Sequence, residues 1–261
     1  MSRYLLQLPS AGLVNGIDSV FVNDISVGKY LEILTLRNAY SNSIGKILVN
    51  EYVEDKSILK YLPAVDKEFI ASNLYVECFS DVVNISLKCP NCDHNIKEEF
   101  NIANYEYYFL EDKDRRLFTQ RMDGKTITLC LPVDIKLKYD IEDYIEKIEG
   151  GELSEYDRSE LEYIIRGDIE MNCGTIKQYS IICNNCSSEI LTNKPYGIGM
   201  LDVNPKDFIN ERKNIFSIFN IFSYAAHQPS GDLMNFTLKD VNIRLDEFLE
   251  FKQKESESMK E

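Results

Sequence analysis

Apolar and polar residues alternate in four short runs, one on either side of each of two Cys-x-x-Cys pairs. The alternation runs along "DVVNISLKC" (81–89) and "NIKEEFNI" (95–102), and it returns in "IKQYSIIC" (176–183) and "SEILTNK" (188–194). A period of two is typical of a strand with one buried face. The pattern therefore predicts two β-hairpins, each with a cysteine pair at its tip.

Helical spacing of apolar residues predominates before the first hairpin. A weakly alternating strand is expected first, and Ser26 is a candidate cap for the helix that follows it. Leu31 and Leu34 supply the apolar face of that helix. The predicted elements are a strand at 18–24 and helices at 26–40, 41–53, 55–63 and 64–79.

Between the hairpins lies an insert at about 101–175 that mixes both periods. "KTITLCLP" (125–132) alternates and predicts a strand. Apolar residues at three- and four-residue spacing predict two helices, at 140–150 and 154–172. Asp157 with Glu160 resembles a capping box at the start of the second helix.

Two further helices are predicted after the second hairpin. The segment at 237–254 is amphipathic, whereas the segment at 204–228 is apolar almost all round after residue 214. A stripe in the latter helix is either core or a docking surface for another subunit. The stripe consists of Phe216, Ile218, Phe219, Ile221 and Phe222.

Together these elements predict an α+β protein, a zinc-ribbon-like double β-hairpin with a long α/β insert, flanked by helical N- and C-terminal regions. The expected division is an N-terminal region at 1–80, the hairpins with their insert at 81–200, and a C-terminal helical region at 201–261. No run of about 18 apolar residues occurs, so no membrane span is expected.

Charge narrows the classes of partner. The formal net charge is −14, and both nucleic acid and anionic lipid require basic surface for non-specific binding. We therefore expect neither as a partner. With two histidines in the chain and no Ser/His/Asp or Cys/His arrangement at a favourable spacing, no catalytic residues are predicted.

The cysteines carry the specific chemistry. Zn²⁺ takes four ligands in a tetrahedron, and two residues between cysteines let a tight turn direct both sulfurs at one ion. Cys89, Cys92, Cys183 and Cys186 therefore predict a four-thiolate zinc site. Four thiolates leave no open coordination position, so the expected role of the zinc is structural.

Alternatives remain for the cysteine and histidine residues. The four cysteines can be reduced and unliganded, and a thioredoxin-type redox pair is disfavoured because that pair lies at a strand-to-helix junction. His94 can replace one ligand, whereas His227 is expected to form only local hydrogen bonds. The other three cysteines are expected in the core. They are Cys78, Cys130 and Cys173.

Short motifs resemble the baseplate hub assembly family of T-even-like contractile-tailed bacteriophages. Near the start of the chain is "LPSAG" (8–12), in which Leu8, Pro9, Ser10 and Gly12 match an "LPS-x-G" segment. A later "LP-x-x-D" motif is matched by Leu62, Pro63 and Asp66, ahead of the strand that leads to the first cysteine pair. A second cysteine pair after an insert also occurs in several relatives.

The resemblance implies a structural or assembly component of a phage tail baseplate, assembled in the host cytoplasm, without catalysis and with other tail proteins as partners. The residues leave one alternative function, a zinc-ribbon accessory protein that binds nucleic acid. That function requires basic or aromatic side chains beside the cysteine pairs, and "CPNCDHNIKEEF" and "CNNCSSEILTNK" supply few. A zinc or thiol enzyme is the third class, and it requires an open coordination position.

Overall fold

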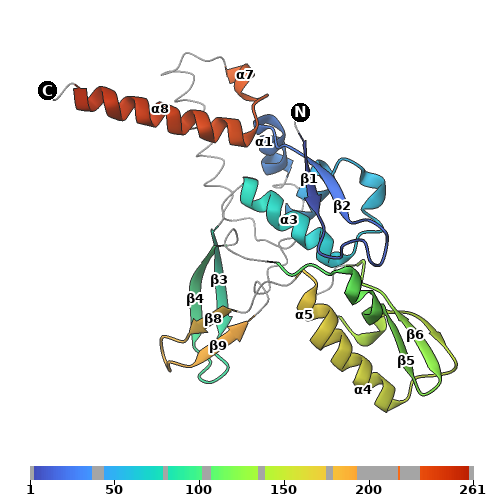
Figure 1. Ribbon diagram of the computed structural model, residues 1–261. Helices are drawn as coiled ribbons and strands as arrows, with labels where there is room; N and C mark the ends of the chain where they lie inside the picture. Colours follow the sequence, from blue (N-terminus) through green and yellow to red (C-terminus); the bar gives the residue numbers. More distant parts are fainter. Residues whose placement is uncertain are drawn as a thin grey trace.

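The computed structural model describes residues 3–36, 44–78, 82–101, 107–134, 139–174, 179–192, 217 and 230–258. Helices and small antiparallel sheets are mixed throughout these ranges, as expected for an α+β protein. Three parts extend from the centre of the molecule: the paired hairpins, the insert and a long C-terminal helix (Figure 1). The predicted helix at 204–228, with its apolar stripe and His227, lies outside the described residues apart from Ser217.

The N-terminal part packs a hairpin against three helices. Strand β1 (Arg3–Gln7), which the sequence pattern did not predict, pairs with β2 (Ser19–Asn23). The helices begin close to their predicted starts. They are α1 (Val27–Leu36), α2 (Ile44–Tyr52) and α3 (Ala64–Cys78), and the predicted helix at 55–63 reduces to a 3-10 turn at Lys56–Ile58.

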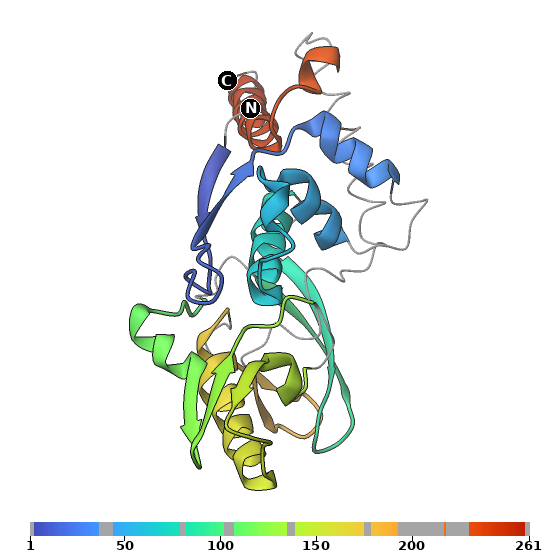
Figure 2. The same cartoon turned by 90° about the vertical axis from the view of Figure 1, so that its right-hand side faces the viewer.

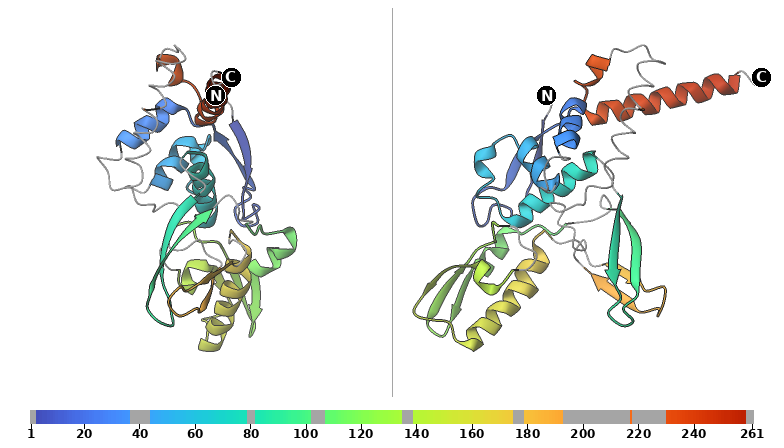
Figure 3. Two further views of the ribbon diagram at one scale, coloured as in Figure 1. Left: turned by 90° about the vertical axis from the view of Figure 1, so that its left-hand side faces the viewer. Right: turned by 180° about the vertical axis from the view of Figure 1, so that it is seen from behind.

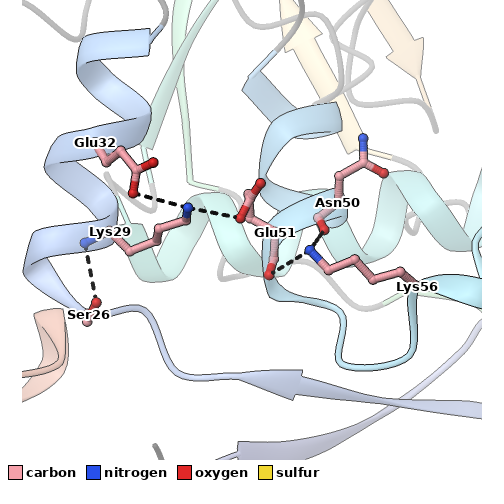
Figure 4. A network of polar contacts seen from close by, with 6 residues as sticks. All are labelled: Ser26, Lys29, Glu32, Asn50, Glu51 and Lys56. Atoms are coloured by element: carbon pink, nitrogen blue, oxygen red, sulfur yellow. Dashed lines mark hydrogen bonds and ion pairs between the residues drawn. The ribbon is translucent and has the colours of Figure 1, made fainter.

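Polar contacts hold α1 and α2 together at the surface (Figure 4). Lys29 on α1 forms ion pairs with Glu32 on its own helix, at 3.1 Å, and with Glu51 on α2, at 3.2 Å. At the end of α2, Lys56 donates to the backbone oxygens of Asn50 and Glu51. A lysine at this position interacts favourably with the helix C-terminus, where carbonyl groups lack intrahelical partners.

The insert is a three-stranded sheet covered by a helix (Figures 1 and 2). The strand order is β5 (Thr119–Met122), β6 (Lys125–Leu129) and β7 (Ile145–Glu149). Helix α4 (Glu155–Ile164) continues through a π-helical turn at Ile165–Ile169 into α5 (Glu170–Asn172). Ser154 caps α4, and Asp157 completes the capping box with Ser154 rather than with Glu160.

The predicted helix at 140–150 is wrong. Residues Ile141–Tyr144 form one 3-10 turn, and β7 follows. Ile145 pairs with Leu129 and Ile148 with Ile127, because the register shifts between Thr128 and Leu129. This irregularity has the character of a β-bulge, which lets residues three apart lie opposite residues two apart. The three-residue spacing therefore imitated a helix.

The two predicted hairpins are present. The first consists of β3 (Val82–Lys88) and β4 (Asn95–Asn101), and the second of β8 (Tyr179–Ile182) and β9 (Glu189–Thr192). They lie side by side in every view, although they belong to different parts of the sequence (Figures 1 and 3). After them come α7 (Ser230–Leu233) and α8 (Leu238–Ser258).

Buried apolar residues form two clusters. The first combines the N-terminal part with the hairpins and the start of α8, and includes Leu62, Leu74, Ile96, Ile181 and Val241. The second fills the insert, between the sheet and α4. The two clusters are joined where the loop after β1 and the first turn of α3 contact the insert.

That joint is built from the two short motifs of the N-terminal part. Asp66 accepts hydrogen bonds from Ser10 N at 3.0 Å and from Ser10 Oγ at 2.6 Å, and both residues are fully buried. Leu110 N donates to Pro9 O, and Ala64 N donates to Pro132 O. The residues flanking Ser10 and Asp66 are therefore bonded directly to the backbone of the insert.

Candidate metal centre

Each cysteine pair occupies a tight turn, and the two turns have the same backbone hydrogen bonds. In the first, Asp93 N donates to Cys89 O at 2.9 Å and Cys89 N donates to His94 O at 2.9 Å. In the second, Ser187 N donates to Cys183 O at 2.8 Å and Cys183 N donates to Ser188 O at 2.9 Å. We call these turns, residues 89–94 and 183–188, the first and second knuckle.

A left-handed residue follows the second cysteine of each knuckle. Asp93 has φ of 56° and Ser187 has φ of 58°. This conformation is unfavourable for residues other than glycine by roughly 1–2 kcal/mol. Aspartate tolerates it better than most residues, because its short side chain bonds locally. The fold maintains this conformation twice at equivalent positions, which indicates that the knuckle shape is required.

The knuckles bring the four sulfur atoms together. All four Sγ atoms lie within 4.8 Å of one another. Across the knuckles, the Cys89 Sγ to Cys186 Sγ distance is 3.6 Å and the Cys92 Sγ to Cys183 Sγ distance is 3.7 Å. No disulfide bond joins any of these four cysteines.

Those distances fit a tetrahedral metal. With Zn–S bonds of about 2.3 Å, the edge of a regular S₄ tetrahedron is about 3.8 Å. The two cross-knuckle distances match that edge and are far longer than a disulfide bond of about 2.05 Å. The donor set, four thiolates, is also the one found in closed structural zinc sites.

Two asparagines join the knuckles around the sulfur atoms. Asn91 Nδ2 donates to Ser188 Oγ at 2.8 Å, and Asn185 Nδ2 donates to Cys92 Sγ at 3.5 Å. Each asparagine stands immediately before the second cysteine of its knuckle, so each reaches from one knuckle to the other. Contacts of this kind orient the ligands of a metal and raise its affinity.

Burial and hydrogen bonding give the thiols different acidities. Burial raises the pKa of Cys89 to about 11. Hydrogen bonding by the Ser188 side chain, followed by its backbone, lowers the pKa of Cys186 to about 6. Cys89 and Cys183 are fully buried, whereas Cys186 is exposed. The site is therefore open to solvent on the Cys186 side, from which a metal ion can enter. The positive charge of the ion would favour the thiolate form of all four cysteines.

Among the described residues, the other candidates add no ligand atom to this cluster. The group of clustered ligand atoms contains four cysteines and no histidine, and His94 contributes its backbone oxygen to the first knuckle. Cys173 is buried as expected, whereas Cys130 is half-buried and not in the core. Cys78 ends α3, and its side chain lies outside the described residues.

Sequence reasoning did not identify the residues that connect the knuckles. Asn91, Asn185 and Ser188 were given no role, although a signal was present. Both pairs have the form Cys-x-Asn-Cys, "CPNC" and "CNNC". The repeated asparagine marks a position that both turns use in the same way.

Comparison with known proteins identifies one family. The family model described as T4 bacteriophage base plate protein matches residues 1–182. The match includes the first knuckle and both N-terminal motifs, and it ends before Cys183. No curated protein and no solved structure matches the chain. None of the helices within the described ranges has the length and apolar character needed to cross a membrane.

Proposed function

This chain belongs to the T4 bacteriophage base plate protein family, and we propose that it acts in the baseplate hub as an adaptor stabilised by a structural zinc ion. Family membership gives a structural role in a phage tail baseplate, with other tail proteins as partners. The proposal adds the zinc, its four ligands and the hub. Its main support is the convergence of four sulfurs from two knuckles more than 90 residues apart in the chain.

Zinc would connect the two ends of the insert. The chain enters the insert after β4 and leaves it before β8, so zinc bound at the knuckles would hold together the two hairpins between which the insert extends. Cys89, Cys92, Cys183 and Cys186 would hold the ion, and Asn91 and Asn185 would hold the knuckles in register. Structural zinc contributes on the order of 10 kcal/mol in small peptides, comparable to the whole stability of an ordinary domain.

A second attachment supports a rigid adaptor. Beside the Ser10–Asp66 contact, the bonds from Leu110 N to Pro9 O and from Ala64 N to Pro132 O attach the insert to the N-terminal part, at a place separate from the knuckles. A part attached at two places resists rotation about either one. The adaptor would thereby present surfaces of the insert and of the N-terminal part at a constant angle to other tail proteins.

The hub assignment rests on the two short motifs that resemble the hub assembly family. The structure gives these motifs a common purpose, because Ser10 of one bonds to Asp66 of the other. The alternative of nucleic-acid binding gains no support beside the knuckles. Exposed Lys88 and Lys97 are offset there by exposed Asp93 and Glu189.

Zinc content tests the metal centre. The purified full chain should carry one zinc per chain by elemental analysis, and its cobalt-substituted form should show the absorption of tetrahedral thiolate coordination. Cys183→Ser should lose the metal and become insoluble, because it removes a buried ligand. Cys186→Ser changes an exposed ligand and should give soluble protein that binds zinc more weakly.

Cys130→Ser provides the matched control, since Cys130 is a half-buried free cysteine outside the cluster. It should retain one zinc. Two results would refute the metal centre: purified wild-type chain that contains no zinc, or a Cys183→Ser chain that binds zinc as tightly as wild type. Supplying each variant to a phage lacking this gene tests the baseplate role separately, by counting plaques and examining tails for complete baseplates.

A further inference from the structure

Helix α8 continues beyond the body of the protein (Figures 1 and 3). Its first turns are fixed. Leu238 and Val241 are buried in the first cluster, and Leu238 N donates to Ile25 O at 2.9 Å. Thr237 and Asp240 form a reciprocal cap at the start of the helix, through Asp240 N to Thr237 Oγ1 and Thr237 N to Asp240 Oδ2. The helix therefore leaves the body in a defined direction.

The apolar seam of α8 extends past this anchor. Leu238, Val241, Leu245 and Phe248 are spaced three, four and three residues apart, which is the a/d spacing of a coiled coil. In the same register Leu249 and Phe251 occupy the flanking e and g positions. Their exposed fractions are 53% and 62%, and Phe248 is half-buried.

An isolated helix as short as the outer part of α8 is only marginally stable in water. Residues 246–258 make up the outer part of α8, and isolated helices shorter than about 12–15 residues gain little stability from propensity alone. Most helices are stabilised by packing an apolar face against another element. The seam at Phe248, Leu249 and Phe251 is the face available for such packing.

Charge selects the kind of occupant. Residues 246–258 contain five acidic and two basic side chains, a net charge of −3. Two copies of α8 would repel each other, and in a parallel pair Lys252 would face Lys252 and Glu255 would face Glu255 at a and d positions. A basic helix from another protein meets both requirements, an apolar seam and complementary charge.

We propose that the outer half of α8 docks against one amphipathic, basic α-helix of another tail protein, in coiled-coil fashion. The identification of the partner as a tail protein rests on the baseplate role. The docking does not depend on the zinc, because α8 contains none of its ligands. Failure of the docking test and loss of zinc are therefore distinguishable in the same set of variants.

Leu249→Ser/Phe251→Ser tests the docking, and Ile243→Ser is the matched control. Ile243 is an equally apolar residue of the same helix, 49% exposed, and it occupies the f position of this register, away from the a/d seam. All three positions are exposed, so each variant should fold and keep its zinc. A photo-reactive phenylalanine analogue in place of Leu249 or Ile243, in cells infected with a phage lacking this gene, identifies what each face touches.

We expect the analogue at 249 to crosslink to a basic amphipathic segment of one phage-encoded protein, and the analogue at 243 to give no such product. Removing two apolar side chains that docking would bury weakens the association by about 100-fold or more. Plaque formation should therefore fall for the double variant and stay normal for Ile243→Ser. Crosslinking to a second copy, equal crosslinking from both faces, or normal plaques with the double variant would overturn the inference.

Discussion

Asp66 is a buried carboxylate that contacts no cationic side chain within the described ranges. Replacing it with asparagine tests the joint between the two motifs. Its hydrogen-bond donors are the backbone and hydroxyl of Ser10. Burial is the largest influence and raises the pKa of Asp66 from 3.8 to about 6, although both Ser10 bonds act in the opposite direction. Cys173 also faces this region, and its own pKa is raised well above the usual value, first by burial and then by Asp66.

The folded-state pKa lies above the unfolded-state value, so the fold favours the protonated carboxyl. Stability from this group is fully present below pH 3.8 and is lost as pH rises through about 6. At neutral pH the ionised Asp66 therefore destabilises the protein by about 3 kcal/mol, at 1.36 kcal/mol per unit of pKa shift. At pH 5 roughly half of that penalty remains.

Asp66→Asn removes the ionisation and keeps the shape. Its amide oxygen can accept from Ser10 N, and its amide nitrogen can donate to Ser10 Oγ. Relative to wild type, the variant should gain stability as pH rises from 5 to 7.5, by about 1–2 kcal/mol. Urea unfolding of both zinc-loaded proteins at each pH measures this difference, and effects of pH on the knuckles cancel because both proteins share them.

Asp157→Asn is the control of opposite sign. The hydrogen bond from Lys125 is the largest influence that lowers the pKa of Asp157 to about 2. The stability it contributes is present above its unfolded-state pKa and is lost only as pH falls toward 2. The difference in free energy of unfolding between Asp157→Asn and wild type should therefore be constant between pH 5 and 7.5. A constant difference for Asp66→Asn over the same range would refute the reasoning about the joint.

Backbone geometry gives two further predictions. Gly174→Ala should lower the free energy of unfolding by about 2 kcal/mol or more, because the new Cβ would lie 1.9 Å from Val65 Cγ2 at a residue with φ of 67°. Chemical denaturation should show that Val65→Ala partly restores the stability of this variant. Gly167→Ala is the control and should lose no stability, because a Cβ there meets nothing within 4 Å. Ser187→Val should be less stable than Ser187→Gly by about 1–2 kcal/mol, because residue 187 is left-handed. Equal zinc affinity and equal denaturation midpoints in the two Ser187 variants would contradict a required knuckle shape.

The hairpins could be predicted because the pattern and the chemistry agreed. Strand alternation on both sides of each cysteine pair placed the pairs at hairpin tips, where the structure has them. Helix α3 was similarly predicted to within one residue of its end. In these segments local spacing and tertiary packing favour the same element.

Other features depend on contacts that local spacing does not encode. Ile145 and Ile148 have helix-like spacing, but the bulge in β7 lets both residues pair with β6. This pairing depends on the position of β6, which the spacing within 140–150 does not encode. Ser10 and Asp66 were noticed as members of separate motifs, but their contact spans 56 residues. The asparagines that link the knuckles likewise acquire partners only when the two turns meet.

The separation of the knuckles also imposes an order on synthesis. Cys92 and Cys183 are 91 residues apart, and a ribosome adding about 5–20 residues per second needs roughly 5–20 s to cover that distance. During this interval the nascent chain holds a half-complete pair of thiols while the whole insert emerges. The insert thus has time to fold before the second hairpin can join the first, so the knuckles meet only after the insert has formed.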